Sequence, residues 1–348
     1  MLVDSPPQEQ ADAPEASVRR RSLRAAGLPL AGCLLLVVAL ASIALGAKSM
    51  SLDAVWHGLI HPTGTDEDVV VRQLRLPRTV LGLLVGAALG LCGAVLQALT
   101  RNPLADPGLL GINLGAAAAV VSAISFLGVT SLTGYVWFAF LGAAAVSVLV
   151  YVLGGTRSAT PVRLALAGTA ASAALYGYIH AVQLMDTAAL DKMRFWSVGS
   201  LASASMTTVW QVLPFLATGL VLALALGRPL NALALGDDTA RALGARLQHT
   251  RVLAMAAATL LCGSATAACG PIVFVGLMVP HAVRALTGPD QRWILPYSAL
   301  LAPVLLLGSD VIGRLVTRPA ELQVGIVTAL LGGPVFIHLV RRRRQAQL

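Results

Sequence analysis

Long uncharged, apolar segments separated by short polar ones make up most of the chain. A helix needs about 20 predominantly apolar residues to cross the hydrocarbon core of a bilayer. On this criterion the sequence predicts ten membrane-spanning helices and an all-α, polytopic membrane fold. These helices fall in residues 25–47, 79–100, 107–156 (two helices), 164–185, 209–227, 252–269, 270–284, 293–311 and 322–340.

The segment 252–283 departs from this pattern because it is too short for two regular spans and a turn. The Gly-Pro pair at 270–271 interrupts the helix, and Pro280 is expected to interrupt it again. Interrupted backbone at membrane depth is tolerated only where protein or a water-filled cavity covers it. We therefore expect a full helix, an extended crossing and a short helix ending near Arg284, which is typical of a transporter core rather than an anchor. The residues expected to take part in gating are Gly270, Pro271, Gly276 and Pro280.

The composition also indicates a protein embedded in the lipid bilayer. The chain is 57% hydrophobic and 12% charged with a mean hydropathy of +0.78, whereas soluble domains carry about 25% charged residues. Ten spans place both termini and most of the 25 Lys and Arg residues on one side, so the positive-inside rule makes both termini cytoplasmic. This asymmetry accounts for the net charge of +9. No nucleic-acid partner is expected, because the sequence offers no soluble basic face.

Three regions follow from these patterns. Residues 1–24 are expected to form a disordered cytoplasmic tail, since Pro and acidic residues are frequent in its first part. Residues 25–341 are expected to form the transmembrane domain, with a cytoplasmic loop at 228–251. Residues 342–348 are expected to form a basic cytoplasmic tail.

The chain carries no recognisable energy source of its own. A P-loop needs Gly-Lys-Ser/Thr, but the two lysines, Lys48 and Lys192, do not follow glycines. Asp310 is the closest candidate for the buried carboxylate of a proton-driven carrier, but Arg314 lies four residues on, where an ion pair would neutralise it. The scattered cysteines and histidines indicate neither a metal site nor a cofactor. We therefore expect transport coupled through a partner protein.

The loop 228–251 contains the expected attachment point for such a partner. Acidic residues begin a short amphipathic helix and Gly244 is a plausible stop. From spacing alone, the helix is equally well explained as a surface cap or as a docking element. The candidate coupling residues are Leu235, Gly236, Asp237, Asp238, Ala240, Arg241, Leu243 and Gly244.

Three arginines flank spans on the opposite, outer side: Arg75, Arg78 and Arg314. They are explained either as interfacial anchors that reach lipid headgroups or as a basic rim for an acidic soluble protein or an anionic substrate. Residue types and positions alone slightly favour the anchors. Glycines at four-residue intervals from Gly82 to Gly90 favour internal helix packing over a dimer contact.

Several ordered sequence blocks resemble the FecCD family, the permease subunits of type II ATP-binding-cassette importers for iron-siderophores, haem and cobalamin. The matching blocks are residues 75–111, 196–201, 236–244, 270–284 and 318–334, within a resemblance that extends from about Ala47 to Arg341. Gln323 departs from the pattern, since many relatives have Pro there.

The resemblance implies ten helices per subunit and a dimer of permeases, identical or different, with two cytoplasmic ATPase subunits and a soluble substrate-binding protein outside. It implies that Arg75, Arg78 and Arg314 pair with acidic residues of that binding protein, and that residues 235–244 bind in a groove of the ATPase. The expected function is transport of a ferric siderophore across the inner cell membrane by a permease that is not itself an enzyme. Haem and cobalamin are the alternative substrates. A nucleotide-independent secondary transporter is the main rival, and a structural scaffold is disfavoured because interrupted helices would serve no purpose in one.

Overall fold

The computed structural model describes residues 12–129, 131–155 and 160–345, and all regular structure in these ranges is helical. In chain order the helices are α1 (Asp12–Ala44), α2 (Leu52–Ile60), α3 (Asp66–Val69), the π-helical turn η1 (Val70–Arg75), α4 (Leu76–Thr100), the 3₁₀ turn η2 (Pro107–Leu110), α5 (Ile112–Leu127), α6 (Leu132–Leu153), α7 (Pro161–Met185), α8 (Thr187–Trp196), α9 (Met206–Ala225), α10 (Gly227–Ala234), α11 (Asp237–Ala242), α12 (Leu247–Cys269), α13 (Val275–Thr287), α14 (Gln291–Val316) and α15 (Val324–Gln345).

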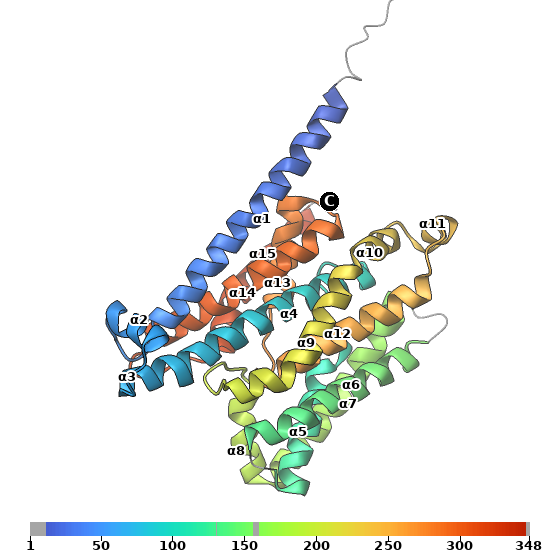
Figure 1. Ribbon diagram of the computed structural model, residues 1–348. Helices are drawn as coiled ribbons and strands as arrows, with labels where there is room; N and C mark the ends of the chain where they lie inside the picture. Colours follow the sequence, from blue (N-terminus) through green and yellow to red (C-terminus); the bar gives the residue numbers. More distant parts are fainter. Residues whose placement is uncertain (1–11, 130, 156–159, 346–348) are drawn as a thin grey trace, which may run out of the picture.

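Helix α4 lies at the centre of the bundle (Figure 1). It packs against α14, α12, α13 and α9, and 78% of its most apolar window is buried, compared with 11% for α1. Small residues allow this central position: a Cβ at Gly86 would overlap the backbone of Pro303 in α14. Helix α1 is peripheral, and its N-terminal half extends beyond the bundle.

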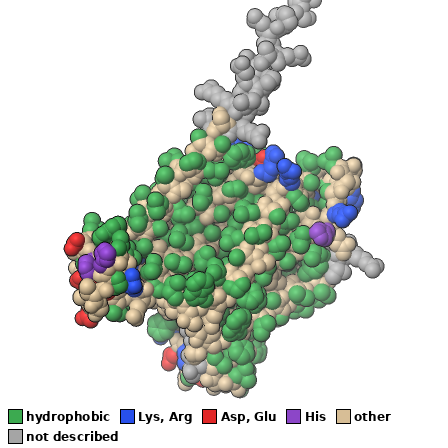
Figure 2. All heavy atoms as spheres, in the orientation of Figure 1, with side chains coloured by type: hydrophobic (Ala, Val, Ile, Leu, Met, Phe, Trp, Pro, Cys, Tyr) green, Lys and Arg blue, Asp and Glu red, His purple; other side chains and the backbone are tan. Residues whose placement is uncertain are grey.

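Six helical segments of the described chain are long and apolar enough to cross a membrane. They are Arg24–Ala44, Asp66–Thr100, Thr133–Leu153, Met206–Ala225, Leu247–Cys269 and Gln291–Val316. The other four segments predicted to span are also helical, but they are shorter or less apolar: α5, α7, α13 and α15. Figure 2 shows hydrophobic side chains across the middle of one face and charged side chains gathered at its ends, as expected for a surface in contact with lipid.

The predicted ends of the chain need correction. The expected disordered tail 1–24 is helical from Asp12, and Pro14 is compatible with the helix because it falls in the first turn of α1, where its missing N–H costs nothing. The expected basic tail 342–348 begins inside α15, which ends at Gln345. Residues 1–11 and 346–348 lie outside the described residues.

Helix α8 was not expected from the sequence. Asp186 caps its start by accepting hydrogen bonds from the backbone N–H groups of Ala188 and Ala189, at 3.0 and 3.1 Å. The helix is too short and too polar to span a membrane, so it lacks the long apolar run that identifies a span in the sequence.

Candidate functional site

The predicted break between α12 and α13 is present. Helix α12 ends at Cys269, an extended linker follows, and α13 begins at Val275. Gly270 has a left-handed φ of 75°, and a Cβ there would overlap the carbonyl oxygen of Trp196. The interruption therefore depends on glycine at this position.

Backbone contacts join this linker to two other segments. The N–H of Ser200 donates to the carbonyl oxygen of Cys269 at 2.8 Å, and the N–H of Gly325 donates to that of Gly199 at 3.1 Å. A Cβ on Gly325 would overlap the carbonyl oxygen of Val198. The end of α12, the loop after α8 and the start of α15 thus meet through main-chain atoms.

Pro280 does not interrupt the chain as expected, because α13 runs through it from Val275 to Thr287. Proline has no N–H to offer the carbonyl oxygen of Gly276, four residues earlier. The Gln97 side chain of α4 supplies the missing donor: its Nε2 atom lies 3.2 Å from the carbonyl oxygens of both Gly276 and Leu277. Arg284 Nη1 donates to Gln97 Oε1 at 3.2 Å and fixes the amide orientation.

Helices α4 and α13 also cross at very short range, because a Cβ on Gly93 would overlap the carbonyl oxygen of Gly276. Of the predicted gating residues, Gly270 and Pro271 lie in the linker, whereas Gly276 and Pro280 lie in α13 against α4.

The three arginines predicted on the outer side lie together at one end of the bundle, and all are buried: Arg75, Arg78 and Arg314 are 4%, 7% and 2% exposed. Asp310, which is fully buried, accepts from Arg78 Nη2 at 2.8 Å and Nε at 3.0 Å, and pairs with Arg314 Nη2 at 3.0 Å. Arg78 Nη1 also pairs with Glu321 at 2.6 Å. The side chains therefore do not reach lipid headgroups as anchors would.

Backbone carbonyl oxygens complete this arginine cluster. Arg75 donates to those of Ile43, Ala44 and Lys48 at 2.6–2.9 Å. Arg314 donates to the Ser42 and Leu45 carbonyls at 3.1 and 2.9 Å. The cluster thereby holds the end of α1 against α4 and α14, a role that residue positions alone could not reveal.

A cavity of about 340 Å³ opens beside the arginine cluster. Cations outnumber carboxylates in its lining, which includes Lys48 with Arg75, Arg78, Arg314 and Glu321. Docking of an acidic partner stays a prediction. The cavity is the place where a carboxylate could approach the buried guanidinium groups.

At the opposite end, the predicted coupling helix forms as α11, which Gly236 (φ 101°) and Gly244 (φ 77°) bracket in conformations that favour glycine. Asp237 joins it to the bundle by pairing with Arg101 at the end of α4 and with Arg251 of α12, the latter at 2.7 Å. Burial alone would raise the pKa of the Asp237 carboxyl, but bonds from Arg251 and Arg101 outweigh it and hold that pKa below its ordinary value of 3.8.

The remaining coupling residues divide between the base and the surface of this loop. Ala240 is fully buried, whereas Leu235 and Leu243 are 58% and 67% exposed. Arg241 and Asp238 form an exposed ion pair at 3.0 Å. Leu235 and Leu243 thus leave apolar side chains exposed on a loop that the ion pairs of Asp237 fix to the bundle.

Comparison with known proteins identifies the family. A model of the FecCD transport family matches residues 34–342. The chain belongs to this family. A FecCD relative, the ferric enterobactin transport system permease protein FepD of Escherichia coli K12, is 46% identical over 323 residues, which cover 92% of this chain and 96% of the relative. The hemin transport system permease protein HmuU of Yersinia pestis is 37% identical over 319 residues, which cover 90% of this chain and 94% of that relative.

A solved structure of a metal-chelate type ABC transporter in an inward-facing conformation agrees with the FecCD chain at a TM-score of 0.78 and 30% identity, covering 90% of this chain and 97% of that one. This likeness supports the all-helical fold, whereas six of the ten predicted spans meet the length and apolarity needed to cross a membrane in the described residues.

Proposed function

We propose that this FecCD chain is the permease subunit of an ATP-binding-cassette importer that carries ferric siderophores across the cytoplasmic membrane. The match to the family over residues 34–342, with the ferric enterobactin permease among its relatives, carries the proposal. Separate ATPase subunits hydrolyse the ATP. Haem is the second candidate substrate, because a hemin permease is also among the relatives.

The proposed assembly contains a second permease, identical or different, two cytoplasmic ATPases and an outer substrate-binding protein. Both termini and the loop 228–251 lie on the cytoplasmic side of the domain 25–341. The exposed side chains of Leu235 and Leu243 bind the ATPase there. The ion pairs of Asp237 support this assignment, since they tie the loop to α4 and α12 and would pass its movement into the bundle.

Helix α4 provides the connection from this loop to the proposed gate. Arg101 at its end contacts the loop, and Gln97, one turn earlier, holds α13 by two carbonyl oxygens. Rigid-body rocking of α4 would therefore carry α13 with it and bend the chain at the Gly270 linker, as alternating access requires.

At the outer end, the cavity beside the arginine cluster receives an acidic side chain of the binding protein. The excess of cations in its lining favours such an approach by complementary charge. Because these arginines already have internal partners, docking would add a carboxylate to an existing network.

Uptake into proteoliposomes tests the function. The chain is reconstituted with its ATPase, with binding protein outside, and ferric siderophore accumulation is measured with and without ATP. Uptake that needs both ATP and binding protein supports the proposal. Uptake that needs neither would replace it with a secondary transporter, and uptake of haem alone would favour the haem alternative.

Two variants separate the roles of the two ends. Leu243→Glu should abolish ATP-driven uptake while Leu52→Glu, at an equally exposed position of α2 (74%), should retain it. Lys48→Glu, which reverses the exposed cation of the cavity lining, should lose stimulation of ATPase activity by the binding protein. Basal ATPase activity of this variant must persist, since its loss would indicate misfolding of the arginine cluster instead of failed docking.

A further inference from the structure

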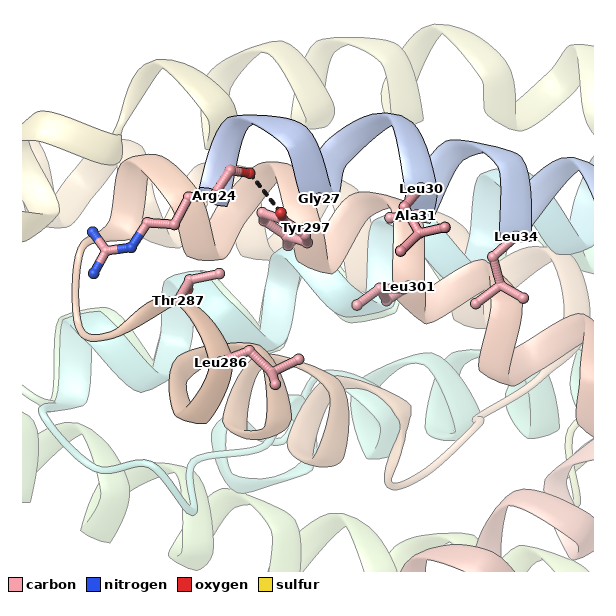
Figure 3. Close-up of a pocket in the computed structure, with 9 residues that line it drawn as sticks. All are labelled: Arg24, Gly27, Leu30, Ala31, Leu34, Leu286, Thr287, Tyr297 and Leu301. Carbon is pink, nitrogen blue, oxygen red and sulfur yellow. Dashed lines mark hydrogen bonds between the residues drawn. The ribbon is translucent and has the colours of Figure 1, made fainter. Parts of the chain in front are cut away.

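A groove outside all of these sites lies between α1, α13 and α14 (Figure 3). Its volume is about 580 Å³. Residues from all three helices line it: Arg24, Leu30 and Leu34 from α1, Leu286 and Thr287 from α13, and Tyr297 and Leu301 from α14. Neither the arginine cluster nor the coupling loop shares these residues.

The groove is held open by a specific contact between α1 and α14. The Tyr297 hydroxyl donates to the backbone carbonyl oxygen of Arg24 at 2.6 Å. This approach requires glycine at position 27, because a Cβ there would overlap the tyrosine hydroxyl. The two helices are thus fixed at one point, and the groove exists before any ligand arrives.

Leucines make the wall of the groove apolar and accessible. Leu30 and Leu286 are 72% and 76% exposed, and Leu34 is 45% exposed. Leu30 and Leu34 lie along the part of α1 that is long and apolar enough to cross a membrane. Surface leucines at this depth face lipid chains rather than water.

One cation lies at the end of the leucine wall. Within the described part of the chain, no carboxylate pairs with the Arg24 guanidinium. The neighbouring Arg292, by contrast, is neutralised by Asp290 at 2.9 Å. Asp290 also accepts a hydrogen bond from Asn231 of α10, which places this end of the groove on the same side as the coupling loop.

We propose that this groove is a binding site for an anionic phospholipid. The phosphate pairs with Arg24, and an acyl chain lies along Leu30, Leu34 and Leu286. An arginine that no carboxylate of the described residues neutralises, followed by exposed leucines, matches a charged headgroup followed by apolar chains. Basic pockets between membrane helices on the cytoplasmic side select anionic headgroups in this way. A bound lipid would contact both α1 and α13 and would stabilise their packing next to the proposed gate.

Native mass spectrometry of the full-length chain in neutral detergent tests the site with two lipids of identical acyl chains, phosphatidylglycerol and phosphatidylcholine. The wild type should prefer phosphatidylglycerol by about fivefold, the ratio expected for one arginine near a headgroup of net negative charge, because the choline ammonium cancels the phosphate charge in phosphatidylcholine. Arg24→Gln should abolish the preference, whereas Arg228→Gln, an exposed arginine at the same end, should keep it. Leu286→Ser should weaken both lipids equally.

Equal binding of the two lipids by the wild type, or an unchanged preference in Arg24→Gln, would overturn the proposal. Thermal unfolding of each variant should match that of the wild type, which shows that the substitution causes no folding defect. A second copy of the chain is the competing occupant. Leu286→Cys combined with Cys33→Ala would then form a disulfide-linked dimer in lipid-free detergent, and this result would also overturn the lipid site.

Discussion

Replacing Asp310 by asparagine tests whether one buried carboxylate holds the arginine cluster together. Asp310 accepts from Arg78 and Arg314, and all three side chains are at least nine-tenths buried. The asparagine keeps the size but removes the charge, so that two guanidinium groups remain buried with less compensation. Its NH₂ group would also face donors instead of accepting from them.

The magnitude follows from what each arginine retains. Arg78 keeps Glu321, but Arg314 loses the one carboxylate that pairs with it among the described residues and keeps only uncharged oxygens. Breaking a buried ion pair from one side costs about 3–5 kcal/mol. Because Arg78 is still paired, we expect Asp310→Asn to lower the free energy of unfolding by about 3 kcal/mol, near the lower limit of that range.

The assay is reversible unfolding in mixed micelles with increasing denaturing detergent. Asp238→Asn is the control, because Asp238 carries the exposed pair with Arg241 and should leave the unfolding midpoint unchanged. The double variant Asp310→Asn/Arg314→Met should recover stability, since it removes the unpaired Arg314 guanidinium together with the Asp310 carboxylate. A loss below about 1 kcal/mol for Asp310→Asn would match an exposed pair and refute the reasoning.

Two further results are expected. Gly93→Ala should cost about 1–3 kcal/mol of stability, because its methyl group must push α13 away from α4. Gly308→Ala in α14, where a Cβ meets nothing within 4 Å, should be neutral or stabilising in the same unfolding assay; equal losses would contradict the close crossing. The stability difference between wild type and Asp237→Asn should be constant above pH 5 and should shrink as the pH falls below 3.8 through the lowered pKa of Asp237. A difference that persists unchanged at more acidic pH, measured by thermal unfolding, would show that the charge of Asp237 is not what holds the loop.

The sequence predicted the helical segments well, because uncharged length alone identifies them. It also predicted the α12–α13 break, since Gly270 and Pro271 act on their own backbone. It was wrong about Pro280, because the outcome depended on a donor from far along the chain. Gln97 reaches the freed carbonyl oxygen across the α4–α13 contact, and no local pattern indicates that meeting.

In the arginine cluster, too, the local contact was predicted and the contacts between distant segments were not. The spacing of Asp310 and Arg314 predicted their ion pair, which the structure contains at 3.0 Å. Arg78 and Glu321 join the same carboxylate network from other parts of the chain. These side chains are buried because α1, α4 and α14 pack around them. Their position beside a span in the sequence therefore could not show whether they are exposed or buried.

The junction of three segments at Gly199, Gly270 and Gly325 limits which substitutions can alter the substrate preference of such permeases. These contacts join main-chain atoms, and glycine supplies no side chain to alter. Side chains elsewhere along the helices can therefore be exchanged without rebuilding the junction. Redesign of substrate preference should tolerate many substitutions around this point and very few at the three glycines themselves.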